Sequence, residues 1–491
     1  MINRVASGEL RAYLGILSVA LSTIVVGSGC ATNPATGKRQ LMMMSEAQEI
    51  ALGQQSDPQI VAAYGLYGDP ELQAYVERIG LELARTSERP DLPWTFRVLD
   101  DPVVNAFALP GGFIYVTRGI MAYLNSEAEL AGVLGHEIGH VTARHGANQV
   151  SKQQLAGFGL GVGMILAPEL AQSYGGLAQQ ATQLMFLKFG RDDERQADEL
   201  GFRYSVRGNY DVREMPNVFE TLRRVSEATG GGRVPAWMST HPDPGARART
   251  TAAMVAESGL DFDTLDVRRD FYLERIDGMV FGANPREGYF DEDGRFLHPE
   301  LAFALDFPAD WQTVNQRRAV IGLSPERDAI MQLTLAEQAD PAAASREFLS
   351  QDGLTGGRVR TFRVNGLQAA GGSFEATSGS QEVSGLIAHI RYGQNTYALL
   401  GYGLTDTWDE RGRQVDRWIG SFDRVTDQGV LSVQPARLDI VDLKRSLPLD
   451  EFARRYPTTA DAETLAMINQ VGADGLVGTR PGVKRVLGGK Q

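Results

Sequence analysis

Cysteine is nearly absent from this sequence: the 491-residue chain contains only one, Cys30, and it contains six histidines. A single cysteine excludes an internal disulfide framework, a CxxC redox pair and any zinc site with two or more thiolate ligands. Basic residues are also in short supply, because 48 Lys and Arg stand against 61 Asp and Glu and give a net charge of −13. Nucleic acid is therefore not an expected partner, since phosphate binding requires a basic surface.

Long apolar runs are scarce as well, and the clearest one lies at the amino terminus. A segment with Arg4 and Arg11 is followed by an uncharged apolar stretch from Tyr13 to Val26. That stretch is shorter than the roughly 20 residues of a membrane-spanning helix. A short positive region followed by a short apolar core is typical of a secretory signal peptide, which we assign to residues 1–29.

Cys30 stands where cleavage is expected, directly after Val26-Gly27-Ser28-Gly29. The sequence resembles a bacterial lipobox, which implies that Cys30 is lipidated and becomes the first residue of the mature chain. Gly27 replaces the aliphatic residue that is usual there, so a plain signal peptide with an incidental cysteine is the alternative. Ala31 after the cysteine favours, by the same resemblance, the outer membrane over the inner one. We expect a periplasmic protein anchored to the outer membrane through Cys30.

The remaining chain is expected to be α+β and to fall into several parts. Residues 30–44 are small and polar and predict a lipid-anchored linker. Residues 45–265 predict a mainly helical domain with a small β-sheet, because helical periodicity at 71–85 precedes a β-rich run at 111–117. A capping box, Ser126-Glu127-Ala128-Glu129, predicts the start of a further helix.

Two further parts are predicted after residue 281. Short β-rich runs between turn residues at 285–430 predict an α+β domain with a mostly antiparallel sheet, of unknown role. Its sequence at 307–311 weakly resembles the opening of PsbP/Mog-type sheets. Residues 436–487 resemble a LysM-like ααβ unit in layout, but the usual Gly-Asp-Thr after the first strand is missing. We therefore expect at most a weak contact with peptidoglycan.

One motif carries recognisable chemistry: His136-Glu137-Ile138-Gly139-His140, about ten residues inside the capped helix. Histidines at i and i+4 lie on one helix face and can bind one metal ion. Glu137 stands beside them, where it can reach a metal-bound water. Because no second thiol is available, imidazole and carboxylate ligands favour zinc. The alternative is a helix with two incidental histidines.

A catalytic zinc site requires a third protein ligand and an open position. Glu194 and Asp198 share a face at i, i+4 near the start of a second predicted helix. Glu194 is the candidate third ligand, and Asp198 is a candidate to fix the tautomer of a ligand histidine. The spacing alone leaves open that this acidic pair is a solvated helix face. His145 is expected to point away from the ligand face and to be structural.

Three motifs together resemble one peptidase family: the sequences at 136–145 and 105–119, and the ExxAD pattern of Glu194–Asp198. They are similar to the HtpX/BepA-like zinc metallopeptidases of the CAAX prenyl peptidase superfamily, over roughly residues 45–260. The long transmembrane segments of HtpX are missing, because the apolar stretch Leu155–Pro168 is short and stops at Glu169. The resemblance therefore implies a periplasmic lipoprotein member.

The resemblance implies a gluzincin-type metalloendopeptidase with one zinc ion per chain. Its zinc ligands would be His136, His140 and Glu194. Glu137 would act as general base on a zinc-bound water. Asp198 would accept a hydrogen bond from the ring N–H of a ligand histidine that faces away from the metal.

The same resemblance implies three further roles around the site. His241, within Ser239-Thr240-His241-Pro242, would be a regulatory fourth ligand, although a His-Pro in a loop is also commonly structural. Arg247 would lie near the reacting atoms and assist catalysis. The strand Phe113, Ile114, Tyr115, Val116 and Thr117 would hold the substrate as an added β-strand, with an ordinary core strand as the alternative.

The expected function is hydrolysis of peptide bonds in misassembled or unfolded envelope proteins. The alternative is a chaperone-like outer-membrane assembly factor whose peptidase site is normally latent, closed by His241 and the segment 150–187.

Overall fold

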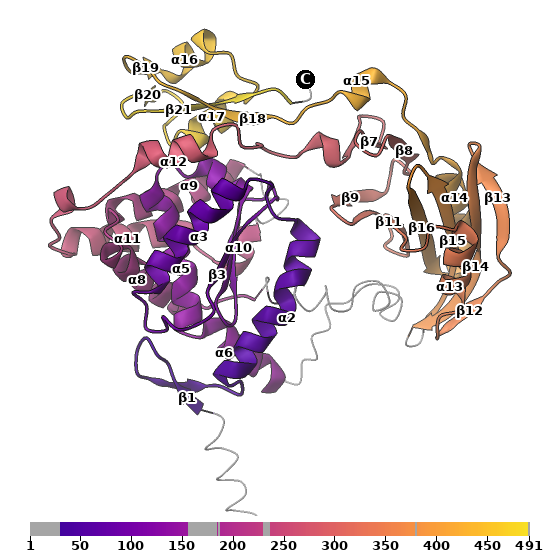
Figure 1. Ribbon diagram of the computed structural model, residues 1–491, viewed down its shortest axis with the longest axis horizontal. Coiled ribbons are helices and arrows are strands. Elements are labelled where there is room, and N and C mark those ends of the chain that lie inside the picture. The colour runs from indigo at the N-terminus through magenta and orange to yellow at the C-terminus, as the bar shows by residue number, and fades with distance from the viewer. Residues whose placement is uncertain (1–29, 156–183, 185–186, 229–235, 379–380, 490–491) are drawn as a thin grey trace, which may run out of the picture.

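The computed structural model describes residues 30–155, 184, 187–228, 236–378 and 381–489 (Figure 1). The predicted signal peptide at 1–29 and nearly all of the apolar stretch 155–168 lie outside the described residues. Helices and sheets are mixed along the chain, so the α+β prediction is confirmed. Among the described residues, no helix has both the length and the apolar character needed to cross a bilayer.

The described residues up to Ile276 form a mainly helical body with a small sheet. Its helices are α2 Glu46–Tyr64, α3 Pro70–Ala84, α4 Arg118–Tyr123, α5 Glu127–Thr142, α6 His145–Leu155, α8 Arg191–Arg207, α9 Met215–Ala228, α10 Ala236–Thr240, α11 Pro244–Glu257 and α12 Arg269–Ile276. Short 3-10 helices lie at η1 Val212–Glu214 and η2 Phe262–Thr264. The helices predicted at 71–85 and after Ser126 are confirmed as α3 and α5.

The small sheet contains β3 Thr95–Leu99, β4 Ala106–Leu109 and β5 Phe113–Thr117, in the order β3-β5-β4. Strand β5 is central, because β3 pairs with it in parallel and β4 pairs with it antiparallel. All five β5 residues are buried. The prediction that Phe113–Thr117 accepts a substrate strand is therefore wrong, since both sides of β5 already carry a neighbouring strand. Sequence motifs reveal a strand but not its place in the sheet.

The segment predicted as a linker at 30–44 is instead a docked hairpin. Strands β1 Cys30–Thr32 and β2 Arg39–Leu41 pair antiparallel, and Figure 1 shows them at the foot of the helical body. The Gln40 side chain donates to the backbone oxygen of Ala143 at 3.1 Å, just beyond the end of α5. The backbone N–H of Met43 donates to the hydroxyl of Ser151 in α6 at 3.0 Å. The hairpin is thus part of the helical body.

Helix α5 begins where the capping pattern predicts. The hydroxyl of Ser126 accepts the N–H of Glu129 at 3.1 Å, and Glu129 in turn accepts the N–H of Asn125 at 2.5 Å. One end of the capping box has therefore moved by one residue, but two backbone N–H groups at the start of the helix still find side-chain acceptors.

Helices α5 and α8 pack unusually closely because small residues line their contact. A Cβ atom on Gly135 would lie 3.0 Å from the backbone oxygen of Gly201, and one on Gly139 would lie 3.0 Å from that of Ala197. A Cβ atom on Gly201 would lie 2.8 Å from the backbone nitrogen of His136. This approach brings the histidines of α5 next to the carboxylates of α8.

Replacing Gly201 with alanine should therefore destabilise the protein, although alanine is the better helix former. We expect a loss of about 1–3 kcal/mol in the free energy of unfolding, because the new methyl group meets backbone that cannot move aside. Chemical denaturation measures this directly. The matched control is Gly420→Ala, where a Cβ meets nothing within 4 Å. An unchanged or increased stability of Gly201→Ala would contradict the close-packing interpretation.

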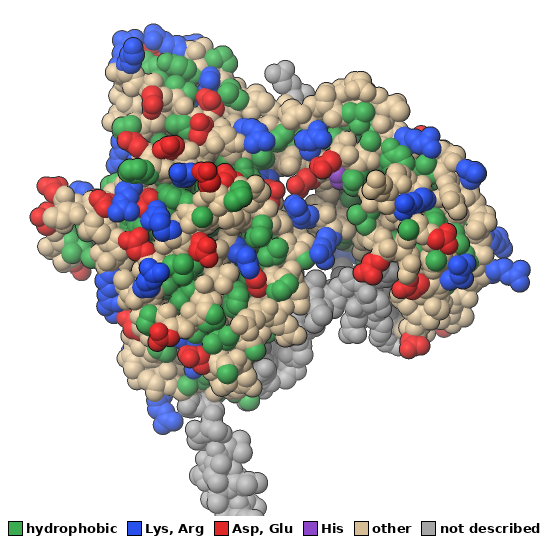
Figure 2. All heavy atoms as spheres, in the orientation of Figure 1, with side chains coloured by type: hydrophobic (Ala, Val, Ile, Leu, Met, Phe, Trp, Pro, Cys, Tyr) green, Lys and Arg blue, Asp and Glu red, His purple; other side chains and the backbone are tan. Residues whose placement is uncertain are grey.

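The following part of the chain is built around an antiparallel sheet. Its strands are β6 Tyr289–Phe290, β7 Arg295–His298, β8 Phe303–Asp306, β9 Gln312–Gln316, β10 Ala319–Leu323, β11 Ala329–Leu335, β12 Leu354–Gly356, β13 Arg360–Val364, β14 Leu367–Ser378, β15 Gln381–Tyr392, β16 Asn395–Leu404 and β17 Asp423–Arg424. The helical elements are η3 Pro285–Glu287, α13 Pro341–Leu349, η4 Thr405–Thr407, α14 Trp408–Gly420 and α15 Gln428–Leu431. The largest sheet runs β12-β14-β15-β16-β11-β10-β9, with β13 beside β14. Figure 2 shows acidic and basic side chains interspersed over the face in view.

The carboxyl-terminal segment packs on the helical body, above α12 in Figure 1. It contains β18 Arg437–Val441, β19 Leu447–Pro448, α16 Leu449–Arg455, α17 Ala462–Ile468, β20 Leu476–Val477 and β21 Val483–Leu487. Leu438, Phe452 and Ile468 belong to the same hydrophobic cluster as Leu130 of α5. Its LysM-like character and the predicted domain boundaries remain predictions.

Candidate metal centre

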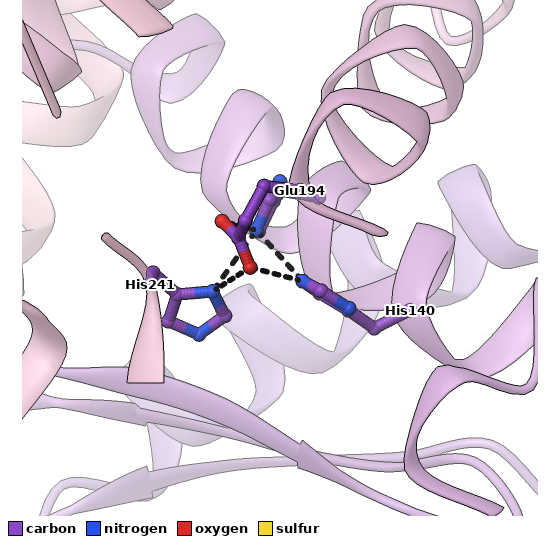
Figure 3. Close-up of side chains that lie close together, drawn as sticks. His140, Glu194 and His241 are labelled. Carbon is purple, nitrogen blue, oxygen red and sulfur yellow. Dashed lines mark hydrogen bonds and ion pairs between the residues drawn. The ribbon is translucent and has the colours of Figure 1, made fainter. Parts of the chain in front are cut away.

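Four side chains converge from three segments of the helical body. His136 and His140 come from α5, Glu194 from α8, and His241 follows α10. One ligand atom from each lies within 4.8 Å of every other, and all four residues are buried. Figure 3 shows the carboxylate of Glu194 between the rings of His140 and His241. The structure thus brings together the predicted ligands and the predicted fourth ligand.

The imidazole nitrogen atoms of this cluster lie within hydrogen-bonding distance of one another. Nε2 of His136 lies 3.0 Å from Nε2 of His140 and 3.3 Å from Nδ1 of His241. Nδ1 of His136 lies 2.9 Å from Oδ1 of Asp198 and 2.9 Å from Nη2 of Arg247. The carboxylate favours a ring proton on Nδ1, and a neutral ring that carries its proton there has its lone pair on Nε2. Lone pairs that face one another in a buried site call for a cation between them, so the residues fit a metal ion.

The carboxylates of Glu194 and Glu137 also indicate a metal-binding site. Oε1 of Glu194 lies 3.0 Å from Nδ1 of His241 and 3.4 Å from Nε2 of His140. Its other oxygen, Oε2, has no hydrogen bond but forms an ion pair with Nη1 of Arg247 at 2.9 Å, whereas Oε2 of Glu137 is buried without a hydrogen-bond partner. Buried polar atoms are normally hydrogen-bonded. The partnerless oxygen of Glu137 beside the histidine cluster is consistent with a site built to hold a metal ion and a water molecule.

Arg247 of α11 binds both carboxylates of α8. Its Nη2 donates to Oδ1 of Asp198 at 2.5 Å, its Nε donates to Oδ2 at 2.9 Å, and Nη1 lies 2.9 Å from Oε2 of Glu194. The guanidinium also lies over the rings of Phe219 and Trp237, 4.2 and 5.0 Å from their centroids. Asp198 therefore holds the ligand His136 on one side and Arg247 on the other.

Burial and these charges shift the pKa values of the cluster in opposite directions. Burial, followed by the charge of Arg247, lowers the pKa of His136 to about 3. Burial opposes ionisation of Glu194, but the charges of His241 and Arg247 outweigh it and hold its pKa well below the usual value. A neutral imidazole and an ionised carboxylate are the forms that bind a metal.

Glu137 lies beside the cluster, and its pKa is shifted in the opposite direction to that of Glu194. Its Oε1 lies 3.7 Å from Nε2 of His241, and the side chain is 1% exposed. Burial raises the pKa of Glu137 to about 7, with the charge of His140 opposing the rise. A carboxyl group with a pKa near neutrality is suited to accept and return a proton.

Aromatic rings cover the remaining side of the cluster. The Phe189 ring stacks on His140 with centroids 4.0 Å apart, and the Trp237 ring stacks on His241 at 5.4 Å. A small cleft reaches His140 beside the end of β4, lined among others by Ala108, Leu109 and Phe189. Access to His140 in this conformation is thus by way of this small cleft, while His241 lies beside Glu137, with Nε2 3.7 Å from Oε1.

His145 lies outside the group of candidate metal ligands, but it contacts the ring nitrogen of His140 that faces away from that group, a contact that the sequence did not indicate. Its Nδ1 lies 3.0 Å from Nδ1 of His140, and its Nε2 lies 2.9 Å from Oε1 of Gln196. The expectation that it turns away assumed a continuous helix, whereas α5 ends at Thr142 and Arg144 has a positive φ of 62°. No sequence pattern indicated Gln196, although it stands two residues after Glu194.

The remaining predicted site residue lies elsewhere. Cys30 is the first residue of β1 and does not belong to the metal-ligand cluster. Its proposed lipidation stays a prediction.

Comparison with known proteins gives the following similarities. The model of the family described as "Peptidase family M48" matches residues 70–255. The "Beta-barrel assembly-enhancing protease" of Escherichia coli (strain K12) is 29% identical over 245 residues, which cover 47% of this chain and 50% of that protein. The "Mitochondrial metalloendopeptidase OMA1" of Schizosaccharomyces pombe is 30% identical over 243 residues, which cover 48% of this chain and 68% of that protein. The chain thus spans about half the length of the first of these relatives.

Solved structures resemble this chain only faintly. Cyanobacterial PsbP (CyanoP) from Synechocystis sp. PCC 6803 has a TM-score of 0.23 and 13% identity, over 26% of this chain and 91% of that one. The Saccharomyces cerevisiae Ran-binding protein MOG1P has a TM-score of 0.22 and 11% identity, over 30% and 98%.

Proposed function

This chain belongs to peptidase family M48, and on that premise we propose that it is a zinc-dependent endopeptidase of the bacterial cell envelope. Its substrates would be misassembled or unfolded envelope proteins. The observation that carries the proposal is the buried cluster of His136, His140 and Glu194, with the partnerless carboxylate oxygen of Glu137 beside it.

Zinc would be held by Nε2 of His136, Nε2 of His140 and the carboxylate of Glu194. Two imidazoles and one carboxylate form a ligand set typical of catalytic zinc sites. When bound, zinc supplies a Lewis acid for the scissile carbonyl and lowers the pKa of water. Glu137 accepts the proton of the attacking water and then delivers it to the leaving amine.

Arg247 would support this chemistry mainly by holding Glu194 and Asp198. Its Nε and Nη2 are committed to Asp198. Only Nη1, which lies 2.9 Å from Glu194 without hydrogen-bond geometry, remains to assist an oxyanion. The proposed oxyanion role thus depends on a single N–H group.

The substrate would extend along β4 in place of β5. Strand β4 lies at the edge of the three-stranded sheet, and no described strand pairs with its other side. Its residues Ala108 and Leu109 line the cleft that also contains His140. Pairing with an edge strand binds a peptide through its backbone, which suits substrates of varied sequence.

We further propose that Cys30 carries the lipid anchor. Because Cys30 is itself the first residue of the docked hairpin, a lipid there would hold the peptidase body directly at the membrane surface, without a long tether. Labelling with a radioactive fatty acid, compared between wild type and Cys30→Ser, tests this anchor.

The function is tested by cleavage of an unfolded protein such as casein by the zinc-loaded chain. Loss of cleavage in Glu137→Gln with zinc retained supports the proposal. Cleavage that persists unchanged in this variant contradicts it.

A second candidate function is a chaperone-like assembly factor with a latent peptidase site. The observation that favours it is the position of His241, whose Nδ1 lies 3.0 Å from Glu194 and whose Nε2 faces Glu137. With His241 in this place, its imidazole would occupy the position that a catalytic zinc keeps open for water.

Replacing His241 with alanine should therefore raise proteolysis of unfolded protein by about tenfold or more, if removing one ligand frees roughly 1.4 kcal/mol. Initial rates of casein cleavage at equal zinc loading measure the effect. The double variant with Glu137→Gln serves as control, because any increase that survives it comes from a contaminating protease. An unchanged or lower rate in His241→Ala would contradict the switch.

A further inference from the structure

The two ring nitrogens of His140 have different surroundings. Nε2 faces the metal cluster, 3.0 Å from Nε2 of His136 and 3.4 Å from Glu194. Nδ1 lies 3.0 Å from Nδ1 of His145, and the two histidines are 2% and 3% exposed. These two buried nitrogens are therefore hydrogen-bond partners, and one of them must carry the proton.

The proton positions can be assigned from the far end of the contact. Nε2 of His145 lies 2.9 Å from Oε1 of Gln196, and the side-chain N–H of Asn33 also donates to this oxygen, at 3.5 Å. An amide oxygen only accepts, so His145 must donate from Nε2. A neutral His145 then offers a lone pair at Nδ1, and Nδ1 of His140 must donate to it. The lone pair of His140 is left on Nε2, where it faces the cluster.

We propose that His145 and Gln196 form a relay that fixes the metal-binding tautomer and orientation of His140, a role that rests on the proposed zinc site. Asp198 fixes the orientation of His136 in the same way, through its contact with Nδ1. Each ligand histidine thus has a partner at the ring nitrogen that does not face the metal cluster. His145 and Gln196 are thus positioning residues, one and two steps away from the metal.

The amino-terminal segments hold this relay in place. The left-handed conformation of Arg144 turns the chain so that His145 points back to His140. Arg144 is fixed by an ion pair with the buried Glu49 of α2 and donates to the backbone oxygen of Met44 at 2.8 Å. Asn33 of the hairpin touches the relay directly. Asp193 lies farther from Nε2 of His145, at 3.7 Å, than Gln196 does.

The test compares zinc affinity by chelator competition in four variants. His145→Phe removes the acceptor for His140, and Gln196→Met removes the acceptor for His145 with little change of size. We expect both to raise the zinc dissociation constant by about 10–100-fold, the usual cost of losing an outer partner of a metal ligand. Gln196→Glu keeps an acceptor and should stay close to wild type. His389→Phe is the matched control, because His389 is also 2% exposed but lies in the antiparallel-sheet region.

A second readout separates the relay from the zinc site. In metal-free protein, nitrogen-15 NMR should show the proton on Nδ1 of His140 and on Nε2 of His145, and Gln196→Met should mix these tautomers. A wild type that binds no zinc would refute the proposed function, while the tautomers still report on the relay. Unchanged zinc affinity in both His145→Phe and Gln196→Met would overturn the inference, even if their thermal stability falls. The opposite tautomer at His145 would overturn it as well.

Discussion

Glu137→Gln should remove peptide-bond cleavage while leaving zinc binding intact. We expect turnover to fall by roughly 10²–10⁴-fold, the usual contribution of a general base. The amide of glutamine cannot take up the proton of the attacking water. Because Glu137 lies outside the metal-ligand cluster, the zinc content should stay at the wild-type level.

The measurement is the initial rate of casein cleavage at equal zinc loading, with zinc content determined on the same samples. Glu129→Gln is the matched control, because Glu129 is a buried glutamate of the same helix whose burial also raises its pKa to about 7. It should keep most of the activity. A Glu137→Gln variant as active as wild type, or a Glu129→Gln variant equally impaired, would contradict the role of Glu137.

Glu194→Ala should abolish tight zinc binding and proteolysis together. The change removes the only carboxylate in the cluster and leaves Arg247 with one ion-pair partner fewer at the site. We expect the zinc dissociation constant to rise by more than the roughly 10–100-fold that loss of an outer partner costs. The free energy of unfolding should fall too, because a buried guanidinium loses part of its compensation.

Glu199→Ala is the control for this variant, since Glu199 is an exposed glutamate of the same helix. Its zinc affinity, measured by chelator competition, and its rate of casein cleavage should equal those of wild type. If Glu194→Ala binds zinc as tightly as Glu199→Ala, then Glu194 is not the third ligand.

The parts of the site that depend on local periodicity could be predicted from the sequence. His136 and His140 share one face of a helix whose start is marked by Ser126, and Glu194 and Asp198 share one face of α8. Their joining into one site was indicated only by family resemblance. Small residues such as Gly135 and Gly201 allow α5 and α8 to approach each other. Nothing in the sequence itself distinguishes these glycines from glycines that make no helix contact.

Other features could not be predicted because they depend on strand order or on one unusual backbone conformation. The sequence of β5 predicts a strand, but it does not predict that this strand is central. Its central position follows from β3 and β4, which pair on either side of it. The hairpin at Cys30–Leu41 makes polar contacts through Asn33 and Gln40 that no sequence pattern indicates. His145 reaches His140 only because Arg144 interrupts the helix.

The most direct test of the proposed function is the metal content of the full chain together with its activity. We predict one zinc ion per chain, loss of casein cleavage when zinc is removed by a chelator, and recovery of both on addition of zinc. A folded protein that cleaves casein equally well after complete removal of metal would contradict the zinc peptidase assignment.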